Sequence, residues 1–288
     1  MRAGAIFPQT EIGADPVAVR DWAQAVEGMG YQHILAYDHV LGASTASRPG
    51  WDGSYSSADM FHEIFVLLGY LAGLTRTVEL VPGVLILPQR QTALVAKQAV
   101  EVDVLSGGRL RLGVGVGWNP VEFEALGEDF HTRGARCDEQ ITVLRALWHD
   151  EAVTFHGRWH TISDAGLNPL PPRRHIPLYV GGQSDAAIRR AAHLGDGWMP
   201  QTPPNDNARA QLARLHAERR AAGREHEPFG IEARLTLRLK PEATWRQYLL
   251  DWQALGATHV TINTMGEGFT TLDQHLDALR RARTALPE

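Results

Sequence analysis

Short apolar runs rich in β-branched residues alternate with stretches of helical periodicity along almost the whole chain. This alternation is typical of repeated βα units that build a parallel sheet. It predicts strands at residues 3–7, 33–37, 78–83, 110–116, 177–181, 197–200, 231–238 and 259–263. It predicts helices at 16–29, 59–74, 92–105, 184–193, 207–222, 244–255 and 272–285. Eight strands of this kind in 288 residues predict an α/β fold, a (β/α)8 TIM barrel rather than an open doubly wound sheet.

Two longer segments interrupt the alternation, and both follow the carboxyl end of a strand. Residues 38–58, after the second strand, are rich in Gly, Ser and aromatic residues, and residues 129–174 follow the fourth strand. The second segment is predicted to hold a helix at 136–149, a β-hairpin around 155–159 and a proline-rich return. Because barrels keep their chemistry at the carboxyl ends of the strands, both insertions are candidate lids or pocket walls of a single domain, residues 1–288.

Composition narrows the class of partner. The net charge is -5, and Lys and Arg are scattered among Asp and Glu, so no basic stripe is present to follow a nucleic acid. No apolar run approaches the roughly twenty residues that span a bilayer, and Pro8 comes too early for a signal peptide. The single cysteine, Cys137, and the isolated His156 and His160 predict neither a disulfide nor a metal site. We therefore expect a cytoplasmic protein that acts on a small molecule.

A glycine-rich stretch at the end of the fourth strand gives the strongest local signal. Side chains are missing at alternate positions, Gly113, Gly115 and Gly117. Trp118 and Asn119 follow, and then Pro120, which suits the first turn of a helix. The pattern predicts a strand end against which a planar ligand lies, although the same glycines would also serve close packing of neighbouring elements. A dinucleotide-binding fingerprint fails in both frames, because Trp118 or Pro120 occupies its last position.

Polar residues also follow the ends of other strands, and we expect them at the same carboxyl-end rim of the barrel. Asp38 and His39 leave the second strand together, and an imidazole there can exchange a proton near neutral pH while the carboxylate orients ligand hydroxyls. The alternative is a helix cap beside a solvated histidine. In the third strand, Pro82 and Gly83 predict a bulge or kink, after which Arg90 would meet an anionic group or form a surface salt bridge.

The fifth strand runs through two glycines into a helix. Gly181, Gly182 and Ser184 would present exposed N–H groups, a helix dipole and a hydroxyl, which suits a phosphate. An ordinary capped helix is the alternative. The sequence contains no G-x-S-x-G elbow and no P-loop, so it lacks the motifs on which hydrolase and kinase activity would depend.

Taken together and in this order, the motifs resemble the bacterial luciferase-like oxidoreductases, and most closely the branch that uses the deazaflavin coenzyme F420. The resemblance covers about residues 1–200, and the last third carries only the barrel pattern. It is carried by Asp38-His39 and by residues 82–90, 96–98, 105–109, 112–119, 133–134, 181–182 and 195–198.

This resemblance implies a barrel with an insertion and a flavin or deazaflavin ring over the kinked third strand, often across a non-proline cis peptide that would match Gly83-Val84. It also implies cofactor contacts from Asp38 or His39, Asn119, Gly181-Gly182 and the segment that starts at Trp198. One position departs from the family. Its deazaflavin sugar-phosphate dehydrogenases carry a catalytic glutamate three residues before the asparagine, where this chain has Val116.

The resemblance and the residues together predict hydride transfer between reduced F420 and a small organic substrate. His39 would exchange a proton with the substrate, between walls formed by Trp51, Tyr55, Trp118 and Phe123. With FMN in place of F420, the protein would be a two-component monooxygenase fed by a separate reductase. A non-catalytic flavin carrier and a cofactor-free barrel lyase or isomerase are the remaining alternatives. Barrels of this family commonly pair, so a homodimer is expected.

Overall fold

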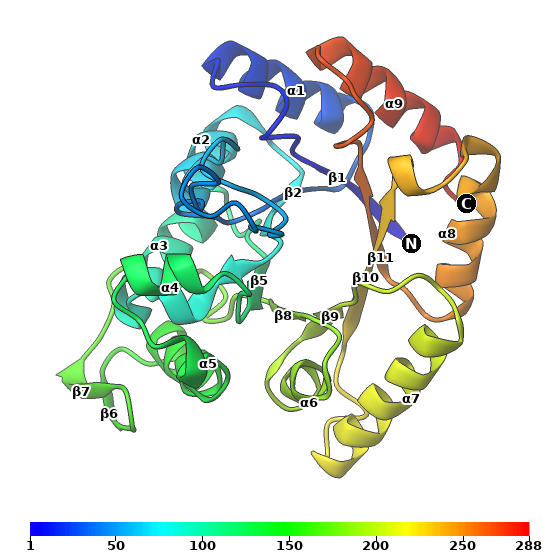
Figure 1. Cartoon of the computed structure of the whole chain (residues 1–288). Coiled ribbons are helices and arrows are strands. Elements are labelled where there is room, and N and C mark those ends of the chain that lie inside the picture. The colour runs from blue at the N-terminus through cyan, green and yellow to red at the C-terminus, as the bar shows by residue number, and fades with distance from the viewer. Residues whose placement is uncertain (288) are drawn as a thin grey trace.

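Parallel strands close into a barrel, and helices surround it (Figure 1). In the computed structural model, which describes residues 1–287, the strand order is β3-β2-β1-β11-β10-β9-β8-β5-β4. β3 (Glu79–Pro82) and β4 (Leu85–Ile86) are two halves of one strand, so the nine segments form eight barrel strands. The Leu80 N–H donates to the Arg109 carbonyl at 2.9 Å and completes the ring. The predicted (β/α)8 barrel is confirmed.

The elements follow the hydrophobic pattern closely. The other barrel strands are β1 (Arg2–Ile6), β2 (His33–Ala36), β5 (Leu112–Gly115), β8 (Leu178–Gly181), β9 (Gly197–Met199), β10 (Gly230–Thr236) and β11 (His259–Asn263). The outer helices are α1 (Pro16–Gly28), α2 (Ile64–Leu74), α3 (Thr92–Leu105), α5 (Arg133–His149), α6 (Asp185–Leu194), α7 (Asp206–Ala221), α8 (Trp245–Ala254) and α9 (Leu272–Thr284). The expected start of α2 at residue 59 is wrong, because the helix begins after Glu63, whose carboxylate caps the Val66 N–H at 2.8 Å.

Side chains alternate along each strand between the helices and the barrel interior. The outward residues form one large apolar core with the helices, which includes the fully buried Trp22, Trp148 and Trp252. The inward residues form a smaller apolar cluster, made of Ile6, Leu35, Val81, Tyr179, Met199 and Met265. This inner cluster fills the middle of the barrel and separates its two ends.

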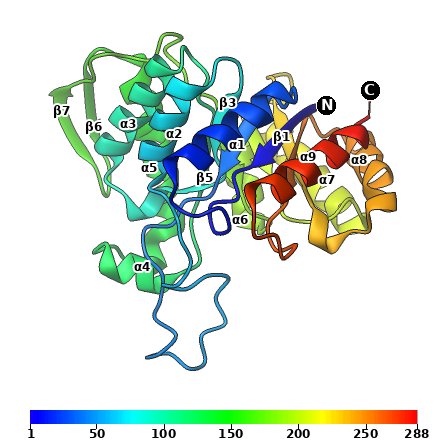
Figure 2. The same cartoon turned by 90° about the horizontal axis from the view of Figure 1, so that it is seen from above.

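The two predicted insertions lie in different places. Figure 2 shows the loop of residues 38–58 at the bottom of the view, well apart from the hairpin of β6 (Val153–His156) and β7 (Thr161–Ala165) at the upper left. The hairpin confirms the predicted turn, and Glu139 of α5 anchors it by accepting the N–H groups of Trp159 and His160 at 2.8 and 2.9 Å. None of the helices within residues 1–287 is both long enough and apolar enough to cross a membrane.

Candidate functional site

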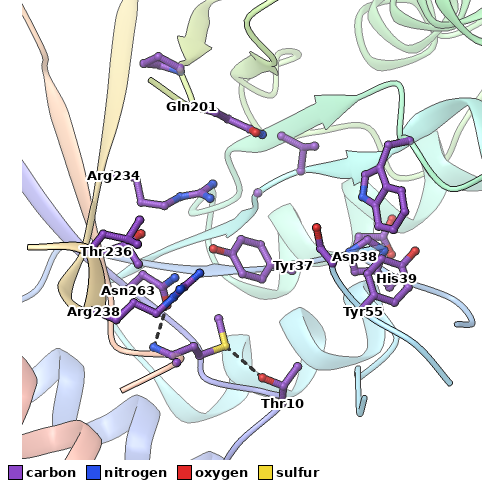
Figure 3. A pocket seen from close by; sticks show the side chains of 18 of the residues that line it. Thr10, Tyr37, Asp38, His39, Tyr55, Gln201, Arg234, Thr236, Arg238 and Asn263 are labelled. Atoms are coloured by element: carbon purple, nitrogen blue, oxygen red, sulfur yellow. Dashed lines mark hydrogen bonds between the residues drawn. The ribbon is translucent and has the colours of Figure 1, made fainter. Parts of the chain in front are cut away.

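A cavity of about 820 Å³ opens where the barrel strands end (Figure 3). This volume falls within the range of small-molecule and cofactor pockets. One wall comes from the segments after β2, from the break between β3 and β4, and from the segment after β5. The other wall comes from the ends of β9, β10 and β11. The loop of residues 38–58 contributes to the first wall, whereas residues 129–174 contribute nothing to either, so the second insertion has no place over this cavity.

The kinked third strand faces the cavity, as the sequence predicted. β3 stops at Pro82, and the Gly83-Val84 peptide that follows is cis and lines the cavity. The Gly83 N–H still donates to the Ala36 carbonyl at 2.8 Å. A Cβ on Gly83 would collide with the side chain of Leu35, so only glycine fits this turn of the strand.

The space beside the glycines of β5, and beside Gly181 of β8, is occupied by other parts of the protein. A Cβ on Gly115 would lie 2.5 Å from the Val84 Cγ2, and one on Gly181 would lie 2.7 Å from the Val84 Cγ1. Gly113 is filled in the same way by the Pro82 carbonyl. The expectation that a planar ligand lies directly on these glycines is therefore wrong. They make room for the broken third strand, which in turn faces the cavity.

The residues predicted to hold a phosphate lie outside the cavity wall. Ser184 accepts the Ala187 N–H at 3.3 Å, which is the ordinary helix cap. Trp198 does not reach the cavity, because its side chain is fully buried on the helix side of the sheet and its indole N–H donates to the Gly182 carbonyl at 2.7 Å. The segment after it does line the cavity, at residues 200–203. A phosphate contact at Gly181, Gly182 and Ser184 remains a prediction.

His39 lines the cavity and rests on aromatic rings. Its ring centroid lies 3.7 Å from that of Tyr55 and 4.7 Å from that of Phe61. Behind it lies a buried carboxylate that sequence reasoning missed, Glu122 of the short helix α4 (Pro120–Ala125). Its Oε2 accepts the Tyr55 hydroxyl at 2.5 Å and lies 3.6 Å from the His39 Nδ1. The imidazole is thus held between an aromatic face and a carboxylate.

The charge state of this group follows from its contacts. Burial raises the pKa of Glu122, but the His39 ring, the Tyr55 hydroxyl and the Val40 N–H lower it more, so the net pKa lies below the ordinary value. The pKa of Tyr55 is raised, first by burial and then by its hydrogen bond to Glu122. At neutral pH the group therefore holds a carboxylate and a neutral phenol.

Asn119 and Trp51 support the same group from behind. The Asn119 Nδ2 donates to the Tyr55 hydroxyl at 2.9 Å, and its Oδ1 caps α4 at the Val121 N–H. Asn119 is buried and is not part of the cavity wall. The Trp51 indole N–H donates to the Tyr55 carbonyl at 2.8 Å, and Trp51 packs against Trp118, which lines the cavity. Phe123 is fully buried and does not form the expected wall.

Asp38 lines the cavity, but its oxygens are occupied. Oδ1 pairs with Arg90 at 2.6 Å and Oδ2 accepts the Ile86 N–H at 2.9 Å. Arg90 also pairs with Glu63 at 3.0 Å, so the salt-bridge alternative for Arg90 holds. Asp38 thus ties β2 to β4 and positions the break in the third strand.

The opposite wall carries residues that the sequence did not single out. They include Asn263 and three basic residues in or just after β10, namely Arg234, Arg238 and Lys240. No motif marks this last third of the chain, and the spacing of basic residues after the seventh strand was the only available signal. Within residues 1–287 no cluster of three or more His, Cys, Asp or Glu is arranged to hold a metal ion.

A closed (β/α)8 barrel with a cavity at the carboxyl ends of its strands is the architecture of a barrel enzyme. The chain belongs to the luciferase-like monooxygenase family, whose model matches residues 3–286.

Similar proteins show the range of this family. An uncharacterized protein of Mycobacterium tuberculosis is 36% identical over 214 residues, which cover 73% of this chain and 73% of its own length. The FMNH(2)-dependent dimethylsulfone monooxygenase of Pseudomonas putida is 30% identical over 208 residues, covering 71% of this chain and 54% of that protein. Among solved structures, an F420-dependent secondary alcohol dehydrogenase in complex with an F420-acetone adduct matches with a TM-score of 0.79 at 16% identity, covering 100% of this chain and 99% of that chain.

Proposed function

We propose that this protein is an F420-dependent oxidoreductase that transfers a hydride between the deazaflavin and a small organic substrate. The observation that carries the proposal is the pairing of two features in one cavity: the broken third strand at Gly83-Val84 and a histidine backed by a buried carboxylate. The family contains both F420-dependent and FMN-dependent members. The F420-dependent dehydrogenase, which matches over almost its whole length, supports the choice of F420.

The cavity would accommodate the ring of a deazaflavin. The wall at Gly83 has backbone in place of a side chain, and Tyr55 and Trp118 offer apolar and stacking surfaces beside it. A deazaflavin supplies two-electron hydride transfer, because carbon replaces the flavin nitrogen that passes single electrons to oxygen. Gly83, Val84, Tyr55 and Trp118 would hold the ring and exclude water from its edge.

His39 would move the proton that accompanies the hydride. Reduction of a carbonyl forms a carbon–hydrogen bond from the hydride and requires a proton at the oxygen, and oxidation of the alcohol reverses both transfers. Glu122 faces the Nδ1 of His39, which leaves Nε2 as the nitrogen for the substrate. Tyr55 packs on the ring and fixes its plane.

Side-by-side titration of the purified apoprotein with F420 and FMN tests the proposal. We expect tighter binding of F420 and anaerobic oxidation of reduced F420 by carbonyl acceptors. Tighter binding of FMN with turnover that requires oxygen would establish the monooxygenase alternative, which the 30% identical FMNH(2)-dependent relative favours and which would need a separate reductase. Binding with no substrate-dependent reactivity would identify a carrier. Binding of neither compound would overturn the proposal.

The His39→Ala variant tests the assignment of the proton to this ring. Loss of a general acid–base typically lowers kcat by about 10²- to 10⁴-fold. We expect a loss of this size with coenzyme affinity nearly unchanged, because Gly83, Tyr55 and Trp118 remain in place. The exposed His226→Ala is the matched control and should behave as wild type. An unchanged kcat in His39→Ala would remove His39 from the reaction.

A further inference from the structure

The cavity carries positive charge that the protein leaves unpaired. Arg234, Arg238 and Lys240 all line it, and among residues 1–287 no carboxylate forms an ion pair with any of them. By contrast, Arg90, which lies outside the cavity lining, is paired with two carboxylates. A cation in a cleft with low-dielectric walls raises the local concentration of anions, and a partly desolvated cation gains from an anionic partner.

Neighbouring side chains hold these cations in place without neutralising them. The Arg234 guanidinium lies 5.3 Å from the centroid of the Tyr37 ring, and the Lys240 Nζ lies 5.3 Å from that of Tyr248. The Arg238 side chain passes across Gly266, where a Cβ would lie 2.7 Å from its Nε. Each cation is therefore positioned by an aromatic face or by bare backbone, and its hydrogen-bond donors stay available.

The carboxylates that share the cavity are already engaged. Asp38 binds Arg90 and the Ile86 N–H, and the Asp59 Oδ2 accepts the Ser56 N–H at 2.7 Å. Both belong to the wall opposite β10. The β10 wall is therefore the positive side of the cavity.

The strand order places this positive side opposite the proposed ring site. β10 is four strands from β3 in one direction around the barrel and four strands from β4 in the other. Figure 3 shows Arg234 and Arg238 on the wall opposite Asp38, His39 and Tyr55. A ring that lies on Gly83-Val84 would leave the space between it and β10 for the substrate.

We propose that Arg234 and Arg238, with Lys240 at the entrance, form an anion subsite that binds a carboxylate or phosphate group of the substrate. The substrate class is then small organic anions that carry a reducible carbonyl or an oxidisable alcohol. Guanidinium groups suit this ligand, since their planar donors match the oxygens of carboxylate and phosphate. The inference rests on the proposed function in one respect: the coenzyme ring is taken to lie on the Gly83-Val84 side of the cavity.

Calorimetric titration of the coenzyme-loaded protein with succinate, and with uncharged succinamide as its neutral isostere, tests the subsite. We expect succinate to bind and succinamide not to bind. The Arg234→Gln and Arg238→Gln variants each lose charge-assisted hydrogen bonds to the anion. Their affinity for succinate should therefore fall by about tenfold or more. Arg234→Lys should retain part of the affinity. The matched control Arg220→Gln, at an exposed position of α7, should bind succinate as wild type does.

A second titration separates the substrate from the coenzyme as the source of the anion. FMN is compared with riboflavin, and F420 with its deazaflavin fragment that lacks the phosphate and the carboxylate tail. If Arg234→Gln weakens FMN or F420 but leaves the fragments unaffected, the cations serve the coenzyme and the subsite proposal is overturned. Equal succinate binding in wild type and Arg238→Gln overturns it as well. Failure of every coenzyme to bind would instead refute the proposed function.

Discussion

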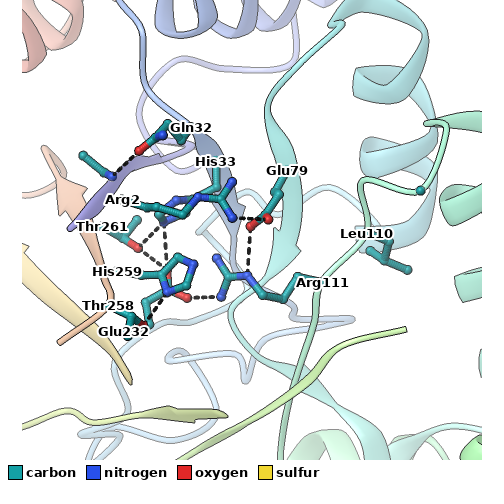
Figure 4. Close-up of polar contacts among 12 residues, drawn as sticks. Arg2, Gln32, His33, Glu79, Leu110, Arg111, Glu232, Thr258, His259 and Thr261 are labelled. Carbon is teal, nitrogen blue, oxygen red and sulfur yellow. Dashed lines mark hydrogen bonds and ion pairs between the residues drawn. The ribbon is translucent and has the colours of Figure 1, made fainter. Parts of the chain in front are cut away.

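The two ends of the barrel treat charge in opposite ways. At the amino ends of the strands, Arg111 lies between Glu79 and Glu232, and the His33 Nε2 lies 2.9 Å from the Glu232 Oε1 (Figure 4). Arg2 extends this network by pairing with Glu79 at 2.5 Å. At the carboxyl ends, three cations face a cavity, and no carboxylate within residues 1–287 pairs with them. The charged side chains at the amino end are paired with one another, whereas the cations at the carboxyl end can meet a ligand.

A single strand shows the contrast. Glu232 and Arg234 both point into the barrel from β10, two residues apart. Burial raises the pKa of Glu232, but Arg111 and His33 lower it more, so it lies well below the ordinary value. The inner apolar cluster lies between the two layers, and Arg111 packs on the Tyr179 ring at 4.6 Å. The paired charges of the amino end therefore serve stability, and the carboxyl end, where such barrels keep their sites, holds the cavity.

The Arg111→Met substitution should produce the largest loss of stability. It leaves Glu79 and Glu232 without their shared cation in a buried site, and breaking a buried pair in this way costs about 3–5 kcal/mol. We expect urea unfolding to show a loss of this size, while the coenzyme affinity of the folded fraction stays unchanged. A loss below about 1 kcal/mol would mean that the network contributes no more than a surface ion pair.

The pH dependence of stability should come from the same end of the barrel. Burial first, and then Arg111, lowers the pKa of His259 to about 3, against an ordinary value of 6.5. Between these values the unfolded chain binds a proton that the folded chain does not. Stability is therefore complete above the unfolded pKa and falls with pH from about 6.5 downward, with a slope that approaches about 1.4 kcal/mol per unit.

His259→Asn is the test of this slope, in urea unfolding at several pH values between 7 and 4. The variant should flatten the curve only in part, because burial also lowers the pKa of His275 to about 4. The exposed His226→Asn should leave the curve unchanged. A slope that is identical in wild type and His259→Asn would exclude His259 as its source.

Sequence patterns predicted the barrel because the hydrophobic pattern of each βα unit can be recognised within a short stretch of sequence. The break at Gly83 was also predictable, since Pro82 cannot take part in a regular strand ladder. Asp38, His39 and Tyr55 were placed at the cavity because strand ends meet at one rim. These predictions need only local chemistry and the rule for where barrels keep their sites.

What could not be predicted depends on contacts between distant segments. Gly115 indicated an open space, but nothing local showed that Val84 fills it. Trp198 sits in a strand too short to reveal which of its faces points inward. Glu122 looks like a polar residue of a short helix until His39 and Tyr55 are brought to it. The place of Arg234 in the cavity, opposite the third strand, is set only when the barrel closes.

The smallest effect should come from removing charge at the mouth, which sharpens the contrast with Arg111. Arg238 is exposed and has no ion-pair partner in the described part of the chain, so Arg238→Gln should change the free energy of unfolding by no more than about 0.5 kcal/mol. Loss of repulsion from the neighbouring Arg234 and Lys240 favours a slight gain at low salt, and salt near 1 M should erase it because charges are then screened over roughly 3 Å. Thermal unfolding at low and high salt measures both values. A large loss in Arg238→Gln would mean that this cation holds the mouth together, and the division of labour between the two ends of the barrel would fail.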